Sequence, residues 1–224
     1  MKSLHVRGIL FALSTSVSLL FAPAVRSQVV QVYNSFGPGN SYNTAIAWGI
    51  EGTSTANGYR GQAQFFVPGT SGYLDQILLE TTHVSGFSNL GNLYIAQDNG
   101  SGIPGSILES WLNVAHPNGS LLLTSTTPVL LQAGQTYWLC DEPAAANTSI
   151  AWYQNNQNIS PGDAYDNSEW SWNTIPAGIE TAGVFALTVT SVPEPSTVAL
   201  FSFSFLVVGF NVLKVRKIQP AAKS

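Results

Sequence analysis

Three carboxylates stand close together in the second half of this 224-residue chain. Asp163, Asp166 and Glu169 lie in the stretch PGDAYDNSEW, with Asn167 among them. Ca²⁺ takes roughly six to eight oxygen ligands, so a loop of this content predicts a calcium site. The spacing differs from that of an EF-hand loop, and a solvated acidic loop without metal is the alternative.

Aromatic side chains flank the same stretch. Trp152 and Tyr153 precede it, Trp170 is its last residue and Trp172 follows shortly after. Residues two apart in an extended strand point to the same side, so Trp170 and Trp172 would present one flat surface. Aromatic faces with amides nearby are typical of sugar sites. The four rings predict a glycan-binding platform, and their burial in a core is the alternative.

The thiol and imidazole chemistry of the chain is sparse. Cys140 is its single cysteine, so no intramolecular disulfide can form. Trp138 and Cys140 share one face of a predicted strand, which favours a buried structural thiol. His83 and His116 lie next to turn-like segments and match no recognisable ligand pair or catalytic triad.

Motifs of the common enzyme classes are absent from the sequence. It contains no Gly-x-Ser-x-Gly elbow, no His-Glu-x-x-His, no Cys-x-x-Cys and no phosphate-binding glycine loop. Acidic residues are numerous enough for chance pairs, so they carry little weight for a glycosidase. We therefore expect no catalytic residues and no cofactor, with Ca²⁺ as the one candidate ion. A hydrolase remains a third hypothesis that no motif supports.

The charge is low and unevenly distributed. Only 9% of the residues are charged, and residues 28–190 hold eleven acidic side chains against one basic one, Arg60. A body with this excess of negative charge repels phosphate backbones, which excludes nucleic acid as a partner. The hydrophobic share of 45% is high enough to form a core.

The first 27 residues have the features of a secretory signal peptide. Lys2 and Arg7 form a positive n-region, and an apolar stretch follows over residues 9–21. Small residues at the required positions allow cleavage after Ala24 or after Ser27. The chain is therefore expected to be exported.

The C-terminal region contains a candidate membrane span. Residues 198–213 (VALFSFSFLVVGFNVL) are nearly all apolar, and their length as a helix is about 24 Å, slightly short of a hydrocarbon core of about 30 Å. Lys214, Arg216 and Lys217 follow at once and can reach the lipid headgroups. Basic residues on this flank predict a cytoplasmic C-terminus, in agreement with an exported body.

The segment before the span is Val192, Pro193, Glu194, Pro195 and Ser196. Two prolines around a glutamate keep it extended, as a protease cleft requires. The order of this motif, an apolar span and a short basic cluster resembles the PEP-CTERM sorting signal. That resemblance, over residues 191–220, implies recognition by an exosortase, a membrane-embedded processing enzyme of Gram-negative bacteria that make exopolysaccharide.

The tail departs from the family pattern in two respects. Its span is rich in phenylalanine, and its basic cluster at 214–217 is interrupted by Val215 and followed by seven further residues. An ordinary single-pass anchor that is never cut is the alternative to a sorting signal.

Between the two ends, residues 28–190 predict one all-β domain. Apolar runs alternate with Gly-, Pro- and Asn-rich turns and show no helical periodicity. The runs cover residues 29–33, 45–50, 63–67, 73–81, 92–97, 107–112, 121–126, 136–140, 149–154 and 183–190. Short strands at this spacing predict a jelly-roll-like β-sandwich.

Two segments of this body carry a second resemblance. Residues 98–108 (DNGSGIPGSIL) and 131–139 (LQAGQTYWL) are similar to parts of choice-of-anchor domains, which often precede such sorting signals. The resemblance implies a β-sandwich and assigns no activity.

Taken together, the sequence predicts an exported, non-enzymatic surface or matrix protein. The inner membrane would hold it until an exosortase cuts near Pro193–Ser196, and it would then reach the outer surface or the exopolysaccharide. A carbohydrate-binding module, possible with or without Ca²⁺, is the second hypothesis.

Overall fold

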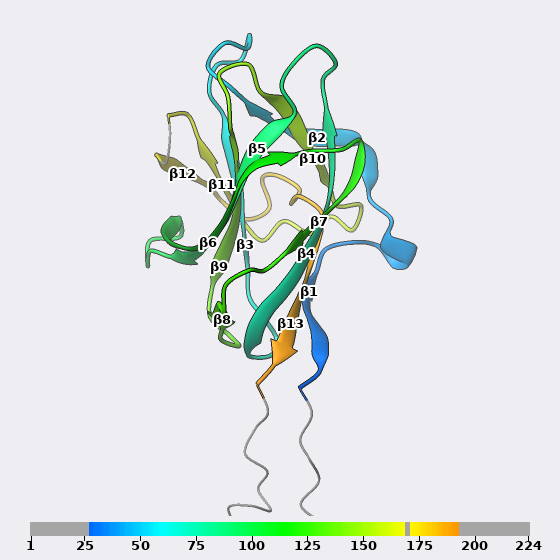
Figure 1. Ribbon diagram of the computed structural model, residues 1–224, viewed down its shortest axis with the longest axis vertical. Helices are drawn as coiled ribbons and strands as arrows, with labels where there is room; N and C mark the ends of the chain where they lie inside the picture. The colour runs from blue at the N-terminus through cyan, green and yellow to red at the C-terminus, as the bar shows by residue number, and fades with distance from the viewer. Residues whose placement is uncertain (1–26, 169–170, 193–224) are drawn as a thin grey trace, which may run out of the picture. The chain divides into compact units, whose positions relative to one another are not determined.

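The computed structural model describes residues 27–168 and 171–192 of the chain. These residues form one compact unit, Gln28–Val192, built almost entirely from antiparallel strands. The strands belong to two sheets that lie face to face around a shared core (Figure 1).

The first sheet has seven strands in the order β1-β13-β4-β10-β2, with β7 and β8 also paired to β4. The 12-residue strand β4 is its centre because it pairs with four other strands. The strands are β1 (Val29–Asn34), β2 (Asn43–Glu51), β4 (Gly72–His83), β7 (Gly119–Thr124), β8 (Leu130–Leu131), β10 (Ser149–Gln154) and β13 (Phe185–Ser191).

The second sheet has six strands in the order β12-β11-β3-β9-β5-β6. They are β3 (Gly61–Phe66), β5 (Leu90–Asp98), β6 (Pro104–Ala115), β9 (Tyr137–Pro143), β11 (Asp163–Asp166) and β12 (Trp172–Ile175). The connection from β6 to β7 passes from this sheet to the first, and a short 3-10 turn, η1 (Pro38–Asn40), follows β1.

Strand alternation explains which side chains fill the core between the sheets. Leu139 in β9 and Ile95 in β5 are register partners and are fully buried. They meet Ile77, Leu187 and Trp152 from the first sheet in one apolar cluster. Every second residue of a strand faces the same way, so one face of each sheet supplies this core.

The opposite face of the second sheet carries a separate cluster. Trp138 and Cys140 alternate with Tyr137 and Leu139 along β9 and pack with Trp172 and small alanines instead. The prediction that Trp138 and Cys140 share one face with a buried thiol is confirmed, since Cys140 has no exposed surface.

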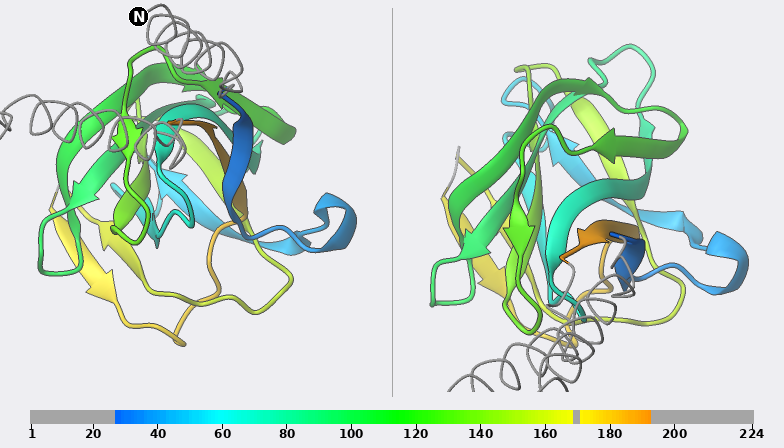
Figure 2. Two further views of the ribbon diagram at one scale, coloured as in Figure 1. Left: turned by 90° about the horizontal axis from the view of Figure 1, so that it is seen from below. Right: turned by 60° about the horizontal axis from the view of Figure 1, so that its bottom comes forward.

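The first and last strands of the body lie side by side. Strand β13 is inserted between β1 and β4, and its Phe185, Leu187 and Val189 are fully buried. Beyond the ladder, the Ser191 N–H donates to the Gln28 carbonyl over 2.7 Å. Both ends of the body therefore lie at one edge of the first sheet, as the blue and orange strands of Figure 2 show.

The all-β prediction is confirmed, and each of the ten predicted runs overlaps a strand. The sequence did not predict β8, β11 or β12. No helix within the described ranges is long and apolar enough to cross a membrane, and residues 1–26 and 193–224, with both predicted targeting segments, lie outside those ranges.

A glycine on β4 tests the closeness of the β4–β13 contact. A Cβ on Gly72 would lie 2.5 Å from Val189 Cγ2 and 2.8 Å from the Thr190 carbonyl oxygen. Gly72→Ala should therefore lower the free energy of unfolding by roughly 1–3 kcal/mol, measured by denaturant titration with tryptophan fluorescence. Gly49→Ala is the matched control, since its Cβ would only touch the Glu51 side chain at 3.5 Å. Equal stability of the two variants would contradict this packing.

Candidate functional site

The predicted acidic loop is largely a hairpin. Asp163 and Asp166 are the first and last residues of β11, which pairs with β3 on one side and β12 on the other. Positions three apart in a strand point to opposite faces. Asp163 lies beside Gln64 on the face toward the first sheet, and Asp166 shares the outer face with Ala164 and Trp172. The structure therefore does not bring these two carboxylates together.

The Asp166 carboxylate already has backbone donors. Its Oδ1 accepts the Ser168 N–H and its Oδ2 the Ser171 N–H, each at 2.8 Å, so it fixes the turn between β11 and β12. Glu169, the third predicted calcium ligand, lies outside the described residues. Across residues 27–168 and 171–192, no three His, Cys, Asp or Glu side chains gather closely enough to hold a metal ion.

Asp163 is in a different position, because it is 2% exposed and neither of its carboxylate oxygens has a hydrogen-bond partner. Burial, with a contribution from the negative charge of Glu180, raises the pKa of Asp163 to about 8. The neighbouring Gln64 donates to the Tyr33 hydroxyl over 3.0 Å, while its Oε1 has no donor. The unpaired oxygens of Asp163 and Gln64 are thus buried in the interior of the body, where apolar side chains are usual.

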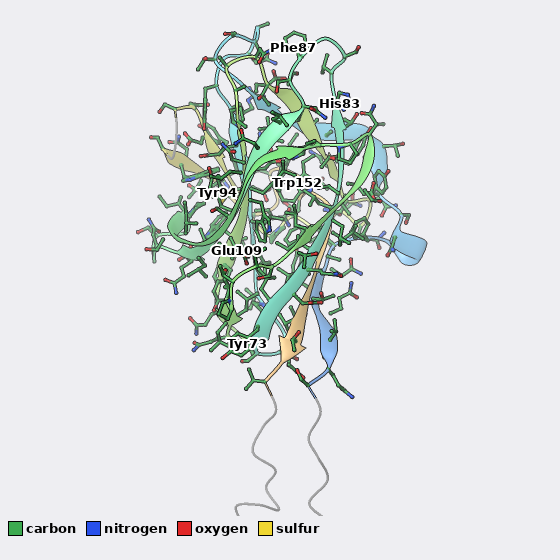
Figure 3. The ribbon with its side chains drawn as sticks, viewed as in Figure 1. Tyr73, His83, Phe87, Tyr94, Glu109 and Trp152 are labelled. Atoms are coloured by element: carbon green, nitrogen blue, oxygen red, sulfur yellow. The ribbon has the colours of Figure 1, made fainter. Side chains whose placement is uncertain are left out.

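The structure corrects the predicted glycan platform at Trp152. This ring has no exposed surface, and Figure 3 shows it in the middle of the molecule. Its Nε1–H donates to the Val184 carbonyl over 2.9 Å, and its ring packs edge-on against Trp48 and Phe185. Trp152 is therefore a core residue. Adjacent residues of a strand point to opposite faces of the sheet. Sequence spacing alone does not show which of these faces is buried in the core and which is exposed to solvent.

The other three aromatic residues do not join Trp152. Tyr153 is half-buried on the outer face of the first sheet, 5.3 Å from the Tyr42 ring centre. Trp172 is buried on the outer face of the second sheet, and Trp170 lies outside the described residues. The described members of the set therefore belong to three separate clusters.

His116 forms a buried pair with Asp141 that the sequence did not predict. His116 Nε2 lies 2.9 Å from Asp141 Oδ2, and neither side chain is exposed. Burial lowers the pKa of His116, but the charge and hydrogen bond of Asp141, with the Val114 and Asn89 backbone, raise it above its ordinary value. The sequence did contain a signal for this pair. Asp141 lies two residues after Leu139, so it shares the inward-facing side of that strand.

This pair has the geometry of a structural brace. Both ring nitrogens are engaged, since Nδ1 lies 3.2 Å from the Val114 carbonyl oxygen. A Cβ on Gly91 would lie 2.5 Å from His116 Cε1, so the glycine leaves room for the imidazole. The imidazole is sealed from solvent and has no free nitrogen with which to act as a general base.

Other buried acids also hold turns in place. Glu109 on β6, labelled in Figure 3, accepts hydrogen bonds from the Thr126 N–H and the Ser125 hydroxyl, both at 2.6 Å. The Glu80 carboxylate on β4 accepts the Ser120 hydroxyl of β7. The Glu109 bonds fix the turn after β7, and the Glu80 bond joins β7 to β4 within the first sheet.

The two segments that resemble choice-of-anchor domains meet in the fold. Asp98, at the end of β5, accepts the Trp138 Nε1–H over 2.9 Å, and its other oxygen accepts the Gly100 N–H over 2.8 Å. The Asp98 N–H also reaches the Thr136 carbonyl. These bonds fasten the loop after β5 to strand β9.

The predicted sorting motif begins at the border of the described body. Val192, 43% exposed, directly follows the last residue of β13. Pro193, Glu194, Pro195 and Ser196, together with Lys214, Arg216 and Lys217, lie outside the described residues.

One further concavity combines aromatic and hydrogen-bonding side chains. This edge groove, of about 560 Å³, lies between β2 of the first sheet and the β3–β11–β12 side of the second. Its polar and aromatic lining includes Trp48, Arg60, Gln62, Gln154, Tyr165, Asn167 and Glu180. Sequence reasoning missed the groove because its walls come from segments far apart in the chain.

No family model matches the chain, and no curated protein matches it.

The raised pKa of Asp163 predicts a pH-dependent stability. Between pH 3.8, the ordinary pKa, and about 8, the folded chain holds a proton that the unfolded chain has lost. The free energy of unfolding should therefore fall as the pH rises through this range. Asp163→Asn cannot ionise, so it should gain roughly 1–3 kcal/mol over wild type between pH 5 and pH 8. Denaturant titrations at both pH values measure this difference.

His116 contributes a pH dependence of the same sign, because its raised pKa stabilises the fold at low pH. It is present in both proteins, so the difference between them isolates Asp163. Parallel pH profiles for wild type and Asp163→Asn would show that Asp163 is ionised in the fold.

Proposed function

We propose that the chain is an exported, non-enzymatic surface or matrix protein whose C-terminal segment is a sorting signal. The signal peptide at residues 1–27 directs export, and the span at 198–213 holds the protein in the inner membrane with its C-terminus in the cytoplasm. An exosortase-type enzyme cuts near Pro193–Ser196 and passes the body to the outer surface or the exopolysaccharide.

The observation that carries this proposal is the position of the motif relative to the last strand. The hydrogen-bonded ladder ends at Ser191, and the predicted sorting motif begins at the next residue, Val192. A cut at Pro193 or beyond therefore removes no strand and no core side chain of the described body. A cut only a few residues earlier would remove the buried Val189.

The pairing of the two ends supports the same proposal. The Gln28 N–H donates to the Ser191 hydroxyl over 3.2 Å, and the Gln28 carbonyl accepts the Ser191 N–H. The N-terminal cut after Ala24 or Ser27 also falls outside this closed ladder. The signal-peptide cut and the cut in the sorting motif thus leave a body whose two chain ends are hydrogen-bonded to each other.

The structural roles of the buried acids and of the His116 imidazole support the non-enzymatic part of the proposal. Asp166 and Glu109 accept backbone donors, and Asp141 pairs with a histidine that is sealed from solvent. Each of these groups has a structural partner that accounts for its position.

Substitution of the motif tests the sorting proposal. A variant with alanine at Pro193, Glu194 and Pro195 should remain uncut and accumulate in the inner membrane of an exosortase-containing host. The readouts are the intact mass of the protein and its distribution among membrane, envelope and medium. The matched control, Pro176→Ala with Glu180→Ala, changes an exposed proline and an exposed glutamate of the body and should be processed normally. Normal cutting of the motif variant would overturn the proposal.

A further inference from the structure

The end of the body at which β13 finishes carries a row of exposed apolar side chains. Val29 on β1 lies opposite Thr190 on β13, and Thr190 lies opposite Tyr73 on β4. Tyr73 in turn lies opposite Leu130 on β8. These four residues, the end row, therefore stand side by side across four strands of the first sheet, and Figure 3 shows Tyr73 at the lower end of the body.

The end row points away from the core. Directly opposed residues of paired strands share one face of the sheet, and the neighbours Val189 and Leu131, on the other face, are fully buried. Val29, Tyr73 and Leu130 are 63%, 44% and 42% exposed. Neighbouring strands lie about 4.8 Å apart, so the row extends over roughly 14 Å from β1 to β8.

The segments that meet at this end contain no charged side chain, although the body as a whole is acidic. They are residues 28–33, 67–74, 129–136 and 188–192. Hydrogen bonds join its two loops, because the Gly134 N–H donates to the Pro68 carbonyl over 3.0 Å and the Ala133 N–H to the Ser71 hydroxyl over 2.9 Å. The end therefore presents apolar and neutral polar groups on an ordered surface.

The proposed membrane span begins a short distance along the chain from this end. Residues 193–197 separate the described body from the apolar stretch at 198–213. A chain extends by at most ~3.3–3.6 Å per residue, so the distance from residue 192 to residue 198 cannot exceed roughly 20 Å. While the chain is uncut, the end of β13 is thus kept close to the lipid.

A lipid surface suits the end row better than a second copy of the chain does. Exposed apolar patches with a polar rim mark interaction sites, and tyrosine is enriched at membrane–water interfaces. Three apolar side chains are few for a stable dimer, which buries about 800 Å² on each partner. A tethered surface needs less affinity, because a short linker gives an effective concentration of roughly millimolar.

Charge selects the same end of the body. Anionic lipids repel the acidic side chains of the remaining surface, so the uncharged end can approach a bilayer most closely. Asp75, the acid nearest to Tyr73 along β4, accepts a hydrogen bond from the Thr188 hydroxyl over 3.2 Å.

From these observations we propose that the end row is a lipid-contact surface that seats the uncut body on the outer leaflet of the inner membrane. Val29, Tyr73 and Leu130 enter the headgroup region, to the ~5–10 Å depth that is typical of interfacial apolar faces. The contact rests on the proposed function, because the span at 198–213 is its tether. It holds the sorting motif at the membrane surface, within reach of a membrane-embedded enzyme.

The test uses the full chain in vesicles of phosphatidylcholine and phosphatidylglycerol that contain a lipid with a nitroxide on its headgroup. Cys140 is fully buried, so a thiol-reactive fluorophore can be placed by one substitution. Thr70→Cys labels the exposed loop before β4, beside the end row. Ser85→Cys labels the exposed loop after β4, near Phe87 at the opposite end of the body in Figure 3. The label at 70 should lose most of its fluorescence to the nitroxide, and the label at 85 should lose little.

Variants connect the quenching to the end row. Tyr73→Glu with Leu130→Glu adds two negative charges that anionic lipid repels, so most of the quenching at 70 should disappear. Tyr73→Ser with Leu130→Ser adds no charge and should reduce quenching in the same direction. The matched control is Leu112→Glu with Leu122→Glu, at two exposed leucines of β6 and β7, and it should keep the quenching. Unchanged tryptophan fluorescence shows that each variant is folded. Equal quenching in wild type and both end-row variants would contradict the contact.

Flotation of the vesicles separates the two ways in which the experiment can fail. A chain that does not float with the vesicles would overturn the proposed span, and this inference with it. A chain that floats with its label at 70 unquenched, or with the labels at 70 and 85 quenched equally, would overturn the end-row contact alone. Energy transfer between chains labelled at 70, without quenching by the nitroxide, would identify a second copy as the occupant and would also overturn the proposal.

Discussion

The structure depends on the insertion of the last strand between the first strand and the central one. Strand β13 pairs with β1 on one side and β4 on the other, and its inward side chains are fully buried. Because β4 in turn pairs with β7, β8 and β10, the first sheet is complete only when residues up to Ser191 are present. This constraint fixes the earliest point at which the chain can be cut without damage, and the proposed sorting motif begins at the next residue.

Many of the acidic side chains of the body are buried, which the sequence alone does not show. Six of its carboxylates are buried, namely Glu80, Glu109, Asp141, Glu142, Asp163 and Asp166. Most of those described above accept hydrogen bonds that fix turns or join neighbouring strands. A protein of this kind gains conformational definition from buried polar groups without the disulfides that many exported domains use. Asp163 is an exception to this pattern, since neither of its carboxylate oxygens has a hydrogen-bond partner.

The sequence predicted the strands well and the sites poorly, for one physical reason. Alternation and turn residues are local, so runs such as 92–97 and 183–190 were found. Strand β11 was read as a loop because aspartates such as Asp163 and Asp166 are rare in strands. Trp152 was taken for a surface ring because spacing shows that residues share a face, but not which face is buried. The edge groove depends on strand order across two sheets, and the jelly-roll connectivity stays a prediction.

The central claim is that residues 28–192 form a closed body that is separated from the rest of the chain at the motif. The intact mass of the protein, recovered from membrane, envelope and medium of its native host, tests this most directly. The account predicts a mature form in the envelope or medium that begins after Ala24 or Ser27 and ends between Pro193 and Ser196. A form that retains residues 214–224 and occurs only in the inner membrane would contradict it, and would identify the chain as a permanently anchored ectodomain.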